Sequence, residues 1–143
     1  MRRGLLAVLM ALPALAGCAA GAPGRGIPPA CPFAGQTRQL RIELYFGLDR
    51  PDGRPISETE WRDFVAREVT PRFPDGLSEL AAGGQWRDRV SNRIGREPSR
   101  ILLLVVPAST DLAARVEGMT ADYRRLFDQQ SVGVVSVPVC AGF

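Results

Sequence analysis

The run Ile101–Val106, which reads ILLLVV, is the strongest β-strand signal in the chain. All of its residues are apolar, and an uninterrupted apolar run is typical of a strand that is covered on both faces. Arg100 precedes the run and Pro107 ends it. We therefore place a central strand of a sheet here and look for its neighbours on both sides of it in the sequence.

Two further strands are predicted upstream of this run. Residues 40–46 alternate between apolar and more polar side chains, which is the period of two of a half-buried strand. Leu77–Arg87 predicts the next strand, and a turn around Ser91–Asn92 leads from it to the central run. The pair Gly83–Gly84 inside this strand predicts a bulge or a close approach of the backbone.

Two amphipathic helices are predicted between the strands. The first begins at a capping box formed by Ser57 and Glu60, and it ends near Thr70, because the residue before Pro71 disfavours helical backbone. The second begins after the N-cap candidates at residues 109–111. Their apolar stripes are interpreted as core rather than as a cofactor site: Trp61, Phe64, Val65 and Val69 in the first helix, and Leu112, Val116, Met119, Tyr123, Leu126 and Phe127 in the second.

The order of these elements, with a last strand at Val132–Val139, predicts the fold class. It is α+β, a ferredoxin-like βαββαβ arrangement in which an antiparallel sheet carries both helices on one face. The first and third strands lie in the middle, and Pro138 places the fourth strand at an edge. The other face of the apolar third strand has no helix, so we expect a second subunit, another protein or a ligand to cover it.

The N-terminal residues 1–17 have the charged, apolar and small-residue order of an export signal peptide. Residues 15–18 read Leu-Ala-Gly-Cys and resemble the lipobox of bacterial lipoprotein precursors. This resemblance implies that Cys18 carries acyl chains such as palmitate and anchors the protein to a membrane of the cell envelope. In a Gram-negative host, Ala19 after the cysteine implies the periplasmic face of the outer membrane. The alternative is a plain secretory signal that is cleaved near Ala20.

Composition excludes several functions. All 18 basic residues among the 143 are arginine, and without lysine or histidine the chain cannot build a Ser-His pair, a Schiff base or an imidazole metal site. Without residues 1–17, 16 arginines face 15 acids, so a nucleic-acid partner is not expected. No cofactor and no metal are predicted. Residues 18–37 are rich in alanine, glycine and proline and are interpreted as a linker to one domain at 38–143.

The predicted topology brings two cysteines together. Cys31 precedes the first strand, and Cys140 ends the fourth strand, which runs antiparallel beside the first. An exported domain lies in an oxidising compartment, so we expect a Cys31–Cys140 disulfide. The alternative is two unpaired thiols.

Five segments resemble a family of small bacterial exported proteins that is known as a domain of unknown function. The resemblance covers nearly all of residues 38–143, and it implies no activity and no catalytic residue. It rests on LYFG at 44–47, VTPRFPDGL at 69–77, GQWR at 84–87, REPS at 96–99 and VCAGF at 139–143.

Several polar and aromatic side chains are expected on the sheet face that has no helices. Alternation along the first strand directs Arg41, Glu43 and Tyr45 there, and Gln85, Trp86 and Glu97 are expected close by. One interpretation is an interface with a partner protein. The other is a cleft for a polar aromatic ligand, in which the candidate catalytic residues are Tyr45, Trp86 and Glu97.

These observations favour a binding or interaction module in an envelope lipoprotein, with a homodimer or another envelope protein as partner. The alternative is a cofactor-independent small enzyme, of the monooxygenase or isomerase type, that uses a cleft in a dimeric α/β barrel. Asp49 and Asp52 beside Gly53 have part of the composition of a calcium loop. Their spacing lacks the alternating ligands and the final glutamate, so a surface turn is the favoured interpretation.

Overall fold

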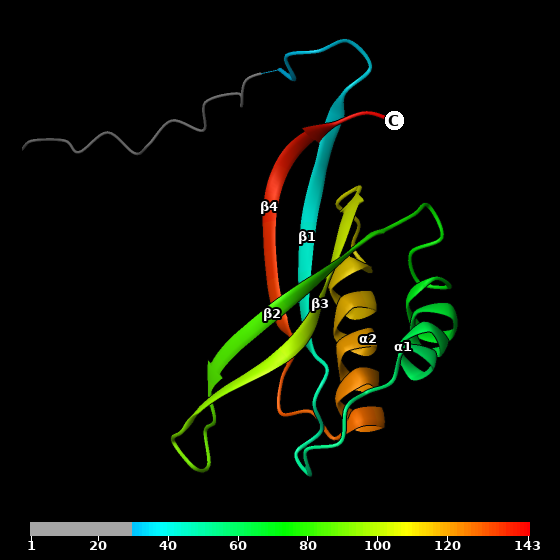
Figure 1. Ribbon diagram of the computed structural model, residues 1–143. Helices are drawn as coiled ribbons and strands as arrows, with labels where there is room; N and C mark the ends of the chain where they lie inside the picture. Colours follow the sequence, from blue (N-terminus) through cyan, green and yellow to red (C-terminus); the bar gives the residue numbers. More distant parts are fainter. Residues whose placement is uncertain (1–29) are drawn as a thin grey trace, which may run out of the picture. The chain divides into compact units, whose positions relative to one another are not determined.

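A computed structural model describes residues 30–143, which contain four strands and two helices (Figure 1). The expected signal peptide at residues 1–17, the predicted lipidation site Cys18 and most of the predicted linker at 18–37 lie outside the described residues. The elements in chain order are β1 (Thr37–Gly47), α1 (Glu58–Phe64), the π-helical turn η1 (Val65–Val69), β2 (Ser78–Arg87), β3 (Ile94–Val106), α2 (Leu112–Phe127) and β4 (Gly133–Ala141).

The four strands form one antiparallel sheet in the order β2-β3-β1-β4. The fold class is therefore α+β, as predicted. The predicted positions of the strands are also confirmed, because β1 and β3 lie in the middle and β4 lies at an edge. Pro138 in β4 faces Leu40 of β1 in the register, and an edge strand is where a residue without an N–H group is tolerated.

One face of the sheet and the two helices enclose the hydrophobic core (Figure 1). The central inward-pointing residues of β1 and β3 are buried, and Phe46 makes an edge-on contact with Tyr123 of α2, with 4.7 Å between ring centroids. The helical aromatic residues predicted as core are all confirmed there. The most deeply buried large side chains are Trp61, Tyr123, Phe46, Leu44, Leu102, Leu104 and Met119.

The first helix begins as predicted. Ser57 is its N-cap, and Ser57 and Glu60 exchange both hydrogen bonds of the capping box. Its last turn is a π-turn, in which the N–H of Thr70 donates to the carbonyl of Val65 at 2.9 Å. In α2 the prediction for Leu126 was wrong, because this side chain is 46% exposed. It lies at the border of the apolar stripe in the last turn, where Phe127 fills the core instead.

The β2–β3 hairpin differs from the prediction in two ways. β3 begins at Ile94 rather than near Arg100, because the polar stretch before Arg100 continues to pair with β2 after the β1 ladder has ended at Ser99. The register between β2 and β3 is regular from Ser78 to Arg87, so the predicted bulge at Gly83–Gly84 is absent from the hairpin. The hairpin therefore extends beyond the helices, and its free end helps to form the site described below.

A disulfide joins Cys31 to Cys140, with 5.5 Å between the Cα atoms, and it confirms the predicted pairing. It ties the segment before β1 to the end of β4, because Cys140 pairs with Arg38 in the sheet. Within residues 30–143, no helix has the length and apolar composition that crossing a membrane requires.

Candidate functional site

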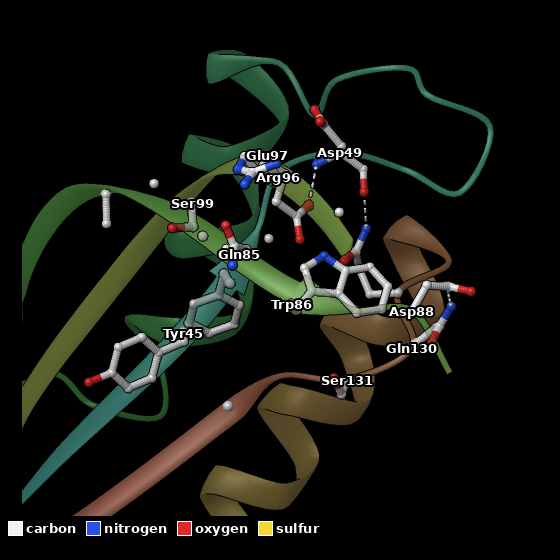
Figure 2. A pocket seen from close by; sticks show the side chains of 18 of the residues that line it. Tyr45, Asp49, Gln85, Trp86, Asp88, Arg96, Glu97, Ser99, Gln130 and Ser131 are labelled. Carbon is white, nitrogen blue, oxygen red and sulfur yellow. Dashed lines mark hydrogen bonds between the residues drawn. The ribbon is translucent and has the colours of Figure 1, made fainter. Parts of the chain in front are cut away.

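A pocket of about 580 Å³ lies between the free half of the β2–β3 hairpin, the end of β1 and the two loops at residues 48–51 and 128–133 (Figure 2). Its floor and walls come from segments that are far apart in the sequence. The side chains that carry polar or aromatic chemistry there are Tyr45, Asp49, Arg50, Gln85, Trp86, Asp88, Arg96, Glu97, Ser99, Asp128, Gln129, Gln130 and Ser131.

Glu97 supplies a half-buried carboxylate to this pocket from β3. The backbone N–H of Asp49 donates to its Oε2 at 3.1 Å, and Figure 2 shows the Trp86 ring beside the same carboxylate. Burial raises the pKa of Glu97, and the negative charge of the Asp49 carboxylate raises it further. Hydrogen bonds from the backbone N–H of Asp49 and from the Trp86 indole lower this pKa. The net pKa is above the usual value, which favours the protonated form of this carboxyl compared with an exposed one.

Gly47 is required for the position of this carboxylate. A Cβ atom at residue 47 would lie 2.5 Å from Oε1 of Glu97, closer than real Cβ contacts. The carbonyl of Gly47 also accepts a 2.7 Å hydrogen bond from the hydroxyl of Tyr123, whose burial in the core raises its pKa. The Tyr123 hydroxyl therefore holds the end of β1 from the core side, and the lack of a side chain at Gly47 leaves room for Glu97 on the pocket side.

Trp86 forms an aromatic wall of the pocket and is 38% exposed. It faces Gly95 across the hairpin, and a Cβ at residue 95 would lie 3.4 Å from the indole Nε1. The missing side chain lets the indole lie against the neighbouring strand. This packing holds the ring beside Glu97 and leaves part of it open to a ligand.

Two glutamines connect the loop after α2 to the rest of the site. Gln130 donates to Asp88 in the hairpin turn at 2.7 Å, and Gln129 donates to the carbonyl of Asp49 at 2.8 Å. Asp88 also accepts backbone N–H groups of its own turn. The bonds from Ser91, with help from Gln130, lower its pKa to about 2. These side chains brace the rim of the pocket.

The predicted site residues separate into two groups in the structure. Trp86 and Glu97 meet in the pocket, and Gln85 borders it. The hydroxyl of Tyr45 instead donates to Glu43 at 2.5 Å, and in Figure 2 it points away from Trp86 and Glu97. This hydrogen bond raises the pKa of Tyr45, and with an ion pair to Arg41 it lowers the pKa of Glu43. The Tyr45 ring still borders the pocket.

The sheet face opposite the helices, which we call the open face, carries the group of Arg41, Glu43 and Tyr45. Around it lie apolar side chains of the neighbouring strands, among which Leu80 is 48% and Val135 is 46% exposed. The remaining members are half-exposed or exposed: Ile101, Leu103, Val105 and Val137. That a partner covers this face stays a prediction.

Sequence reasoning missed most of the polar residues of the pocket, among them Asp49, Asp88, Gln129 and Gln130. Each lies in a loop or turn without a pattern, and only the tertiary fold brings them together. Asp49 appeared in the sequence only as part of a surface turn. The described residues 30–143 contain no group of acidic or cysteine side chains that could hold a metal ion.

Comparisons with known proteins place this geometry in context. A family model described as "Protein of unknown function (DUF3574)" matches residues 41–143. A search of curated proteins found no match.

Two solved structures of a phage protein are similar in fold. The first, a phage SAM lyase in complex with S-methyl-5′-thioadenosine, has 17% identity and a TM-score of 0.60, and the match covers 73% of this chain and 90% of that one. The second, a phage SAM lyase in the apo state, has 16% identity and a TM-score of 0.55, with 78% and 93% covered. At this level of identity the likeness is one of fold.

Proposed function

The chain belongs to the DUF3574 family of proteins of unknown function, and from this premise we propose that its domain binds a small ligand in the pocket at Glu97. One observation carries the proposal: Trp86 and Glu97 meet there, with the carboxylate held by the N–H of Asp49 and accommodated by Gly47. A concave site with an aromatic wall and a few fixed polar groups is typical of small-molecule binding.

The ligand that fits this description contains a flat, polar aromatic ring. The exposed part of Trp86 offers a stacking surface, and Glu97 can accept a hydrogen bond from an amino group of the ring. A pocket of about 580 Å³ suits a nucleoside-sized molecule. The ligand in one of the similar solved structures, S-methyl-5′-thioadenosine, belongs to this chemical class and is a suitable probe.

Isothermal titration of the purified, disulfide-bonded protein with S-methyl-5′-thioadenosine tests this proposal. We expect saturable binding that weakens by at least about tenfold in Glu97→Gln, because the amide cannot replace a fixed carboxylate acceptor. Glu117→Gln is the matched control, since Glu117 is an exposed carboxylate on α2 outside the pocket. Absence of binding, or equal weakening in both variants, would refute it.

The second candidate function is catalysis without a cofactor in the same pocket. Two observations favour it: the raised pKa of Glu97, which suits a general acid or base, and the fold shared with a phage lyase. The test is the consumption of S-adenosylmethionine by the purified protein, measured by liquid chromatography. Turnover that Glu97→Gln abolishes and Glu117→Gln leaves intact supports an enzyme. Binding of the probe without turnover supports the binding module.

The arrangement of the elements supports classing the fold as ferredoxin-like. The chain order β1-α1-β2-β3-α2-β4, with β1 and β3 central and the helices on the core side of the sheet, fits the split βαβ pattern. The strand order of this domain can be compared with that of the two phage structures, which are similar to it in fold. A different strand order in an experimental structure of this domain would overturn the class.

We also propose that the protein is an exported lipoprotein of the cell envelope, in which residues 18–37 link the lipidated Cys18 to the domain. The lipobox resemblance at residues 15–18 supports this. Metabolic labelling with palmitate in a bacterial host tests it. We expect label on the native protein and none on Cys18→Ser, and an unlabelled, released native protein would point to a plain secretory signal instead.

A further inference from the structure

Most carboxylates in this arginine-rich chain form ion pairs. All 15 acidic residues lie within the described part, and nine of them pair with an arginine. The six that form no ion pair with a described arginine are Asp49, Asp75, Asp88, Glu97, Glu117 and Asp128, and the pocket is lined by four of them: Asp49, Asp88, Glu97 and Asp128. Carboxylates without ion pairs are therefore concentrated at the proposed ligand site.

The two arginines that line the pocket do not neutralise this charge. Arg50 points elsewhere, because its guanidinium pairs with Glu60 at 2.7 Å and lies 5.3 Å from the centroid of the Phe127 ring. Arg96 lies next to Glu97 in β3, but it forms no ion pair with any of the described carboxylates. The nearby Asp49 carboxylate raises the pKa of Glu97 and so does not neutralise its charge either.

Trp86 adds the second half of a cation site. Its indole lies beside the Glu97 carboxylate and is partly exposed to the pocket. Of the aromatic side chains, an indole attracts a positive charge most strongly at its face. A carboxylate without a counter-ion beside such a ring presents two attractive surfaces to the same cation.

We propose that the ligand of this pocket carries an organic cation, an alkylated ammonium or sulfonium centre, which packs on the exposed part of the Trp86 ring next to the Glu97 carboxylate. The inference rests on the proposed function, since it assigns the charge of the ligand that binds there. An inorganic cation fits less well, because the described residues hold no group of three or more acidic or cysteine side chains that could coordinate a metal ion.

The test compares choline with 3,3-dimethylbutan-1-ol, a neutral molecule of nearly the same shape. The reporter is the indole N–H signal of Trp86 in an NMR titration of the full-length, disulfide-bonded protein. We expect choline to shift this signal saturably, with a Kd at least about tenfold below that of the alcohol. Trimethylsulfonium as a third titrant distinguishes a site for ammonium groups from one that also accepts sulfonium.

The variants Glu97→Gln and Glu117→Gln each remove one unpaired negative charge, the first inside the pocket and the second outside it. We expect the first to reduce the preference for choline over the alcohol to less than about twofold, and the second to leave it unchanged. An unchanged indole signal of the buried Trp61 confirms that each variant is folded.

The possible results separate this inference from the proposed function. Equal affinity for choline and the alcohol, no binding of either, or an equal effect of the two variants overturns the cation site. Binding of S-methyl-5′-thioadenosine in the same protein would leave the nucleoside-type pocket standing. Selective binding of choline without binding of the nucleoside would support the cation site and refute the proposed ligand class.

Discussion

The helix-covered face and the open face of the sheet are built from the same four strands, yet they differ in composition and in how far their side chains are buried. Towards the helices, Leu44, Phe46, Leu102 and Leu104 have no exposed surface. On the other side, apolar residues remain exposed, and the pocket at its hairpin end contains carboxylates without ion pairs. The first face holds the hydrophobic core of the domain, whereas we propose that the second presents groups that bind an external partner or ligand.

The largest effect is expected from the disulfide. Replacing both Cys31 and Cys140 by serine should lower the free energy of unfolding by about 4 kcal/mol, because the bridge closes a loop of 109 residues. Binding in the pocket should not change, since the bridge lies at the Arg38 end of β1 and the pocket at the Gly47 end. Urea denaturation and titration with S-methyl-5′-thioadenosine measure the two quantities, and reduced native protein is the control. Loss of binding in the folded variant would contradict the separation.

Neighbouring leucines of β3 compare the two faces directly. Leu104→Ala should cost about 3 kcal/mol of unfolding free energy, because Leu104 is completely buried and leaves a cavity. Leu103→Ala, on the open face, should cost about 1 kcal/mol, since that side chain is only half-buried. Urea denaturation of the two variants gives the comparison. Equal costs would mean that Leu103 is covered in solution, as a partner on the open face requires.

Two glycines test whether Glu97 must hold its position. In Gly47→Ala the new Cβ would overlap the Glu97 carboxylate, so we expect affinity for S-methyl-5′-thioadenosine to fall on the order of tenfold. Gly118→Ala in α2 is the control, because Gly118 lies outside the pocket and a Cβ there would come no closer than 3.8 Å to any atom outside its own helix. Isothermal titration measures both. Unchanged affinity in a folded Gly47→Ala protein would show that the carboxylate is not a binding group.

The smallest effects concern pH. Hydrogen bonds from Ser57 and Arg50 lower the pKa of Glu60 from 4.5 to about 2, so its stabilising contribution is present above pH 4.5 and is lost as the pH falls towards 2. The pKa of Glu97 is raised, so its ionisation as the pH rises through the folded value should instead destabilise the protein. Urea denaturation from about pH 2 to neutral pH should show that Glu60→Gln and Glu97→Gln change the pH dependence of the unfolding free energy in opposite directions, Glu60→Gln below pH 4.5 and Glu97→Gln above it. Changes of the same sign would contradict the assigned environments.

Local sequence patterns predicted the helix-covered side of the sheet well. Period-two alternation at residues 40–46 and the capping box at Ser57 depend on interactions within a few residues, so they could be read from the chain. The pairing of Cys31 with Cys140 followed from topology and is confirmed. The start of β3 was missed because Gly95 and Pro98 are weak strand formers, and pairing with β2 outweighs their local preference.

The pocket was only half predicted. Trp86 and Glu97 were named from the expected hairpin, and they do meet there, whereas Tyr45 is engaged by Glu43 instead. Asp49 and Gln129 could not be assigned, because a side chain in an irregular loop gains its partners only from tertiary structure. That Arg50 pairs with Glu60 of α1 rather than with an acid of the pocket also depends on the tertiary structure.

The indole signals of the two tryptophans in this chain offer the most direct test of the central claim, that the pocket at Glu97 and Trp86 is the functional site. Trp61 is buried in the core and donates to Glu79 at 2.9 Å, whereas Trp86 faces the pocket. In an NMR titration with S-methyl-5′-thioadenosine, the account predicts a saturable shift of the Trp86 indole signal while that of Trp61 stays in place. A Trp86 signal that does not move, or that moves together with the signal of Trp61, would contradict it.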